Sequence, residues 1–116
     1  MAASMANRAL RLSRTDPLAF EAHLALGEAA IMEQRYADAA ACFSRAAAAK
    51  PNFSTAYIFQ GISLSLAGET EAARPVIRRA LELEPDFRFR LFHELGLAQP
   101  LVDALFEGAS TLGLPH

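Results

Sequence analysis

Histidine and cysteine are the residues of this sequence that could bind a metal or act as nucleophiles, but their spacing supports neither chemistry. His23, His93 and His116 are far apart, and no His-Glu-x-x-His motif places two of them on one helix face. A single cysteine, Cys42, excludes an internal disulfide and a cysteine-based zinc site. Cys42 stands in an alanine-rich segment with no base nearby in the sequence, so we interpret it as a small buried residue. We expect neither a metal nor a cofactor.

Motifs for other kinds of catalysis are also missing. There is no phosphate-binding loop, nucleophile elbow or paired-carboxylate motif. His93 and Glu94 are adjacent, and adjacent side chains diverge by about 100° on a helix. The sequence therefore predicts that this chain is not an enzyme.

Arginines occur in two groups. The first is spaced by three residues, which places its members near one helix face: Arg8, Arg11 and Arg14. In the second group, Glu71 lies at helical spacing from Arg74, and we expect an ion pair between them. Glu82 lies at helical spacing from Arg78, which predicts a second pair, and Arg79 completes this patch. With 11 basic and 13 acidic residues, the chain lacks the basic excess of a nucleic-acid-binding protein.

Composition favours one all-α domain. The chain has 116 residues, of which 53% are hydrophobic and 21% charged, so it can form a core. Alanine, the best helix former, supplies more than a fifth of the residues. The longest uncharged stretch, residues 51–68, contains Asn, Gln, Ser and Thr, so we interpret it as a partly buried helix and not as a membrane span. Without a signal peptide at the N-terminus, the expected location is the cytoplasm.

The most informative pattern is self-similarity at an interval of 34 residues. The repeated positions are Gly27 and Gly61, Ala39 and Ala73, Ala46 and Ala80, and Pro17, Pro51 and Pro85. Glycine and alanine allow two helix backbones to approach closely, and proline ends each helix pair. Gly68 lies in the turn between two expected helices, where glycine adopts a left-handed conformation at little cost.

The expected helices follow from this register. Two pairs cover residues 18–33 and 36–49, then 54–67 and 70–83, with flanking helices over 4–14, 87–97 and 100–111. Candidate N-caps are Asp16, Ser54 and Asp86. We assign the whole chain, residues 1–116, to one domain, with an N-terminal helix in 1–17, repeats at 20–53 and 54–87, and capping helices in 88–116.

These residues resemble a tetratricopeptide repeat. The first copy carries Leu24, Gly27, Tyr36, Ala39, Phe43, Ala46 and Pro51, and the second carries Tyr57, Gly61, Ala73, Ile77, Ala80 and Pro85. The resemblance implies an all-α helix-turn-helix solenoid of about six helices that binds a protein or peptide. His23 replaces the usual aromatic residue at a position that packs into the repeat core.

A second resemblance covers the ends of the chain. Residues 9–20 (ALRLSRTDPLAF), 81–89 (LELEPDFRF) and 101–116 (LVDALFEGASTLGLPH) are similar to C-terminal tetratricopeptide segments of bacterial regulators. Those proteins carry a class III adenylyl/guanylyl cyclase domain or a winged-helix DNA-binding domain upstream. The resemblance implies a signalling or regulatory context, and the alternative is a stand-alone chaperone or adaptor.

The tetratricopeptide resemblance also implies a concave groove lined by the first helix of each pair. The residues at its lining positions are Glu21, Leu24, Glu28, Ile31, Thr55, Ile58, Ile62 and Ser65, with Phe59 and Leu66 beside them. Leu24 and Glu28 stand where carboxylate-clamping repeats have lysine and asparagine, so that clamp is absent. We expect an apolar groove with an acidic edge.

Three occupants of this groove are open from the sequence: a partner helix or extended peptide, the chain's own C-terminal segment, or a second copy. For a partner-binding groove, Ile58→Arg is expected to abolish binding without unfolding the domain. The apolar residues after position 86 either cap the last repeat or form a homodimer surface. The candidates for self-association are Phe89, Phe92, Leu105 and Phe106.

Overall fold

The computed structural model describes residues 17–88 and 99–114, and within these ranges it contains five helices and no strand. The helices are α2 (Pro17–Met32), α3 (Tyr36–Ala49), α4 (Ser54–Leu66), α5 (Thr70–Leu83) and α6 (Gln99–Leu112). The predicted all-α class is confirmed, and the five described helices are the four of the two predicted pairs and the one predicted over 100–111, close to the six or so that the resemblance implies. The helix expected over 4–14 lies outside the described residues, and the one over 87–97 lies almost wholly outside them.

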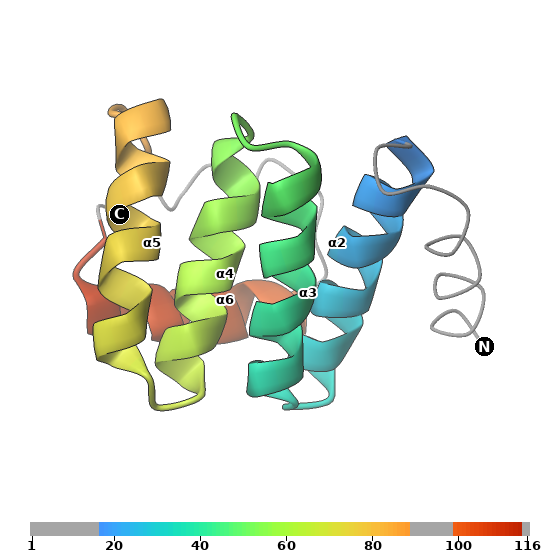
Figure 1. The fold of residues 1–116 in the computed structure, drawn as a ribbon. Coiled ribbons are helices and arrows are strands. Elements are labelled where there is room, and N and C mark those ends of the chain that lie inside the picture. The colour runs from blue at the N-terminus through green and yellow to red at the C-terminus, as the bar shows by residue number, and fades with distance from the viewer. Residues whose placement is uncertain (1–16, 89–98, 115–116) are drawn as a thin grey trace.

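Helices α2 to α5 stand side by side, each antiparallel to the next, and α6 crosses them on one side (Figure 1). The pairs α2–α3 and α4–α5 pack closely, and α3 packs on α4 to join the two pairs. Helix α6 packs mainly against α4, then against α2, and least against α5. It begins on the α2 side and ends on the α5 side.

Two glycines allow the helices within each pair to approach closely. A Cβ atom at Gly27 would lie 2.6 Å from two atoms of the Phe43 ring. At Gly61, a Cβ atom would collide with the Ile77 side chain in the same way. The two contacts are 34 residues apart in the sequence, so the repeat register reproduces one packing arrangement twice.

A continuous core links the two pairs. The rings of Phe43 on α3 and Phe59 on α4 have centroids 5.1 Å apart, which connects the first pair to the second. The small residues Ala39 and Ala73 are fully buried at corresponding positions of α3 and α5. These alanines leave room for the larger side chains between the helices.

The turns inside the two pairs share one hydrogen-bond pattern. The Arg35 amide donates to the Ala30 carbonyl at 2.8 Å, and the Glu69 amide donates to Leu64 at 2.8 Å. Both bonds close a left-handed C-terminal turn, with φ of 61° at Gln34 and 85° at Gly68. The expected left-handed role of Gly68 is confirmed, and Gln34 holds the same conformation without being glycine.

The predicted N-cap at Ser54 is wrong. Phe53 occupies the cap position of α4, no side chain caps that helix, and Ser54 is its first residue, with only 8% of its surface exposed. The Phe53 ring packs edge-on against Phe20 with centroids 5.2 Å apart, a contact that favours Phe53 at this position. Of the other two candidate caps, Asp16 lies outside the described residues, and the helix that Asp86 would cap lies almost wholly outside them.

We predict that Gln34→Gly stabilises the fold by about 0.5–1 kcal/mol, because glycine adopts a positive φ without the steric cost that glutamine carries. Gly68→Gln should lower stability at the corresponding turn. Urea unfolding followed by circular dichroism measures both changes. A loss of stability in Gln34→Gly would contradict this interpretation.

Candidate functional site

The apolar residues of the predicted groove come together in the structure, and they are buried. Ile31 on α2 and Ile58 and Ile62 on α4 are at most 2% exposed, and Phe59 is 3% exposed. Leu24 is partly buried and packs against the same cluster. We call the side of α2 and α4 against which α6 packs the receiving face.

The chain's own helix α6 covers the receiving face. Leu101, Val102, Leu105 and Ala109 of α6 belong to the same hydrophobic cluster as the groove residues, and Leu105 has no exposed surface. These positions recur along one side of a helix, so α6 presents an apolar stripe to α4 and α2. Of the three occupants open from the sequence, the structure therefore contains the C-terminal segment.

A glycine brings α6 close to α4, as glycines do within the helix pairs. A Cβ atom at Gly108 would lie 2.7 Å from Cγ2 of Ile62 and 2.9 Å from its backbone oxygen. The backbone atom cannot move aside easily, so any larger residue at position 108 would push α6 away from α4. A helix that packs on the receiving face as α6 does therefore needs a small residue where it crosses Ile62.

The polar positions of the predicted groove are more exposed than the apolar ones. Glu21 is exposed, whereas Glu28 and Thr55 are half-buried. Burial raises the pKa of the Glu28 carboxyl, and the nearby negative charge of Glu21 raises it further. Ser65 is buried, and its hydroxyl has no hydrogen-bond partner in the described part of the chain.

The expectation that Ile58→Arg leaves the fold intact does not fit the position of Ile58. Its side chain is 1% exposed within the core cluster beneath α6. A guanidinium there would be buried without a partner, which is strongly destabilising. Loss of binding by this variant would therefore report unfolding.

Only part of the proposed self-association set can be located. Phe89 and Phe92 lie outside the described residues. Leu105 faces the chain's own core, so it is not on the surface of this structure. Phe106, in contrast, is 47% exposed on α6.

His23 and Cys42 are both half-buried. Burial lowers the pKa of His23, and the charge of Arg45 lowers it further, so the imidazole is favoured in its neutral form. Its Nδ1 atom has no hydrogen-bond partner among the described residues. Burial raises the pKa of the Cys42 thiol, which disfavours the nucleophilic thiolate. Within residues 17–88 and 99–114, no group of three or more metal-ligating side chains occurs.

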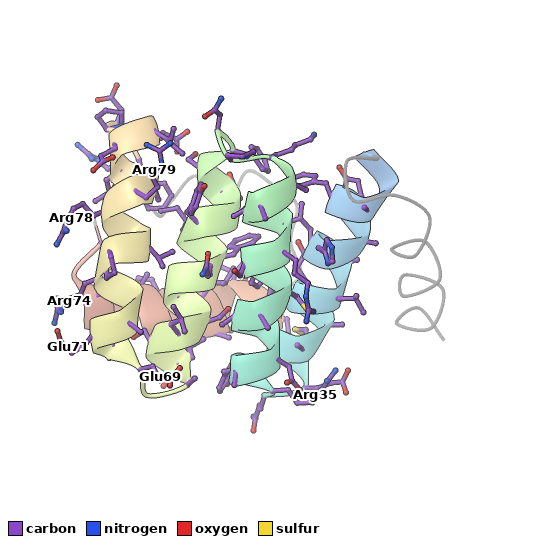
Figure 2. The ribbon with its side chains drawn as sticks, in the orientation of Figure 1. Arg35, Glu69, Glu71, Arg74, Arg78 and Arg79 are labelled. Atoms are coloured by element: carbon purple, nitrogen blue, oxygen red, sulfur yellow. The ribbon has the colours of Figure 1, made fainter. Side chains whose placement is uncertain are left out.

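The arginines of α5 lie on the outside of the helix layer (Figure 2). The predicted pair of Arg74 with Glu71 is present at 3.2 Å. Glu82 pairs with Arg79 at 3.5 Å and not with Arg78 as predicted, because spacings of three and four residues both bring side chains together on a helix. Arg8, Arg11 and Arg14 lie outside the described residues.

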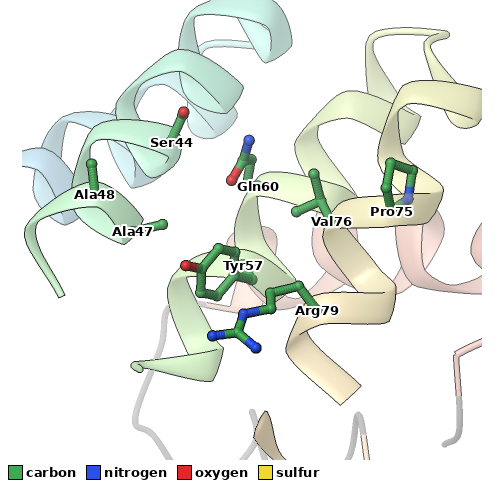
Figure 3. Close-up of a pocket in the computed structure, with 8 residues that line it drawn as sticks. All are labelled: Ser44, Ala47, Ala48, Tyr57, Gln60, Pro75, Val76 and Arg79. Atoms are coloured by element: carbon green, nitrogen blue, oxygen red, sulfur yellow. The ribbon is translucent and has the colours of Figure 1, made fainter. Parts of the chain in front are cut away.

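A second hollow, about 410 Å³, lies between α3 and α5 (Figure 3). Half of its lining residues are small and apolar, and the other half are polar: Ser44, Tyr57, Gln60 and Arg79. The Tyr57 hydroxyl donates to the Pro51 carbonyl at 3.0 Å, and Arg79 is paired with Glu82. Its polar groups are thus partly engaged within the chain, and they do not form a catalytic set.

The sequence predicts that the helix over 100–111 caps the last repeat. The role of Gly108 in bringing this helix close to α4 was not predicted. The available signal was a glycine in line with the apolar positions Leu101 and Leu105, each four or three residues apart. Residues at this spacing lie on one side of a helix, and a glycine among them allows another helix to approach closely. No pattern in the sequence specified which face would receive it.

We predict that Leu105→Ala lowers the free energy of unfolding by about 2–5 kcal/mol, because it leaves a cavity between α6 and α4. Ser110→Ala, on the exposed side of α6, should change it by less than about 0.5 kcal/mol. Urea titration gives both values. Equal stability of Leu105→Ala and the wild type would contradict the burial of α6.

Ionised Glu28 should destabilise the fold. Because its folded pKa is raised, stability falls as the pH rises from the ordinary glutamate pKa, about 4.3, through the folded value. Glu28→Gln should therefore gain about 0.5 kcal/mol at pH 7, a small value because the carboxyl is half-exposed, and nothing at pH 3.5. Thermal melts at both pH values test this, with Glu69→Gln as an exposed control. A gain that persists at pH 3.5 would mean that the charge is not responsible.

Comparison with known proteins relates the first part of the chain to one repeat family. Residues 2–54 match the family model described as tetratricopeptide repeat. No curated protein and no solved structure matches the chain. In the described part of the chain, no helix is long and apolar enough to cross a membrane. Tetratricopeptide domains are in general non-catalytic modules that bind proteins. The match and the paired helices of residues 17–83 support a tetratricopeptide helical solenoid.

Proposed function

We propose that this chain is a non-catalytic protein–protein interaction module and that its binding surface is the receiving face. The residues assigned to binding are Glu21, Leu24, Glu28, Ile31, Thr55, Ile58, Phe59 and Ile62. The observation that carries the proposal is α6 itself, because its apolar stripe demonstrates that α2 and α4 can hold a helix. Helix-in-groove recognition of a partner would use the same contacts.

The partner must compete with α6 for these contacts. A segment tethered to its binding surface has an effective concentration on the order of millimolar. A partner therefore binds only if it offers contacts that α6 lacks, or if α6 is weakened. This requirement makes the module selective, because generic apolar peptides do not outcompete the tethered helix.

For the host protein, we propose the C-terminal region of a bacterial signalling or regulatory protein acting in the cytoplasm. The support is the likeness of residues 9–20, 81–89 and 101–116 to such segments. The alternative is a stand-alone chaperone or adaptor. Reading the gene upstream of Met1 separates the two, since a fused cyclase or winged-helix domain favours the first and a separate gene favours the second.

Site-specific photo-crosslinking in the source cell tests the binding surface. A benzophenone amino acid at Glu21, beside the receiving face, should form adducts with a partner, because a helix bound there passes within its reach. The same probe at Ala41, on the exposed side of α3, is the matched control. Partner adducts at Ala41 but not at Glu21 would move the binding surface elsewhere.

A further inference from the structure

Helix α6 matches the receiving face in shape and hydrophobicity, but it offers no positive charge to the carboxylates on α2. Residues 99–112 include Asp103 and Glu107 and contain no lysine or arginine. The first turns of α6 lie on the α2 side of the molecule (Figure 1). Asp103, in these turns, is exposed and accepts a hydrogen bond from Gln99 at 2.8 Å, so the part of α6 nearest α2 supplies no positive charge.

The edge of the receiving face on α2 is acidic. One side of α2 carries two carboxylates that alternate with two apolar residues, in the order Glu21, Leu24, Glu28 and Ile31. Neither carboxylate forms an ion pair with any residue in the described ranges 17–88 and 99–114. The raised pKa of Glu28 agrees with a half-buried carboxylate that has a like charge nearby.

We propose that the partner of the receiving face is a basic amphipathic helix, which carries the apolar pattern of α6 and a positive charge that reaches Glu28 and Glu21. This inference rests on the proposed function and identifies the class of partner. Such a helix needs a small residue at the position of Gly108, because Ile62 leaves no room for a side chain. Its lysine or arginine supplies the ion pairs that α6 cannot make, which is how it displaces a tethered competitor.

Three labelled peptides serve as probes for the 116-residue chain. The first has the native sequence of residues 99–114. The second, the α2-side basic peptide, carries Gln99→Arg and Asp103→Arg. The third, the α5-side basic peptide, carries Glu107→Arg and Thr111→Arg, so both basic peptides have the same net charge. Positive charges near a helix C-terminus favour helicity, so the helix dipole favours the third peptide and works against the proposal.

Fluorescence anisotropy measures binding to the wild type and to Leu105→Ala, whose α6 is weakened, after circular dichroism has confirmed that both are folded. The α2-side basic peptide should bind about fivefold more tightly than the α5-side peptide. Glu28→Gln should remove this advantage, and Glu69→Gln, in the α4–α5 turn, should not. Hydrogen exchange of residues 101–112 should accelerate when the peptide binds, because α6 is displaced.

Each other outcome overturns the inference in a distinguishable way. Equal binding of the two basic peptides, with α6 displaced, keeps the receiving face as a binding surface and rejects the basic partner. An advantage that survives Glu28→Gln places the attraction elsewhere on the acidic surface. Absence of binding by all three peptides, in Leu105→Ala as in the wild type, rejects the proposed function as well.

Discussion

Close approach of helices at glycine is the constraint on which this architecture depends. Gly27 and Gly61 each leave a space that the side chain of the next helix fills, and Gly108 does the same between α6 and α4. Without these spaces the helices would separate by the width of a side chain, and the buried alanines of α3 and α5 would lose their contacts. The fold is held by shape at these points, because the ion pairs of the described residues lie on the surface and contribute little.

The same constraint governs how the receiving face holds α6. Gly108 lets α6 rest on the backbone of Ile62, and the apolar residues on either side then fill the space between α6 and the layer beneath it. The contacts that stabilise the domain are therefore also the contacts of the proposed binding surface. Any variant that opens the receiving face also removes part of the core, so on the proposed function stability and binding are coupled.

The repeated part of the fold could be predicted closely from the sequence. The helices of residues 17–83 begin and end within about one residue of their expected bounds, because glycine, alanine and proline recur in a single register. Side-chain choices within that frame were harder to predict, as Glu82 and the cap of α4 show. Which arginine pairs with Glu82, and which residue caps α4, depends on small energy differences between alternative side-chain positions. Residue spacing alone does not resolve these differences.

The position of α6 could not be predicted, because no repeat register extends to it. Its apolar stripe was visible in the sequence, as was the apolar character of the groove. Neither pattern indicates that the stripe of α6 covers the groove. A partner or a second copy could equally have covered the groove residues and the stripe. The apolar residues of the candidate site lie in one cluster, and their burial beneath α6 followed only from the three-dimensional arrangement.

The location of α6 also has a consequence for synthesis of the chain on the ribosome. Contacts within α2–α3 and α4–α5 are local in sequence, so each pair can form soon after it leaves the exit tunnel. The contact of α6 with α2 joins segments at opposite ends of the described chain, and it forms last. During elongation the apolar residues of the receiving face therefore lack their cover until α6 emerges.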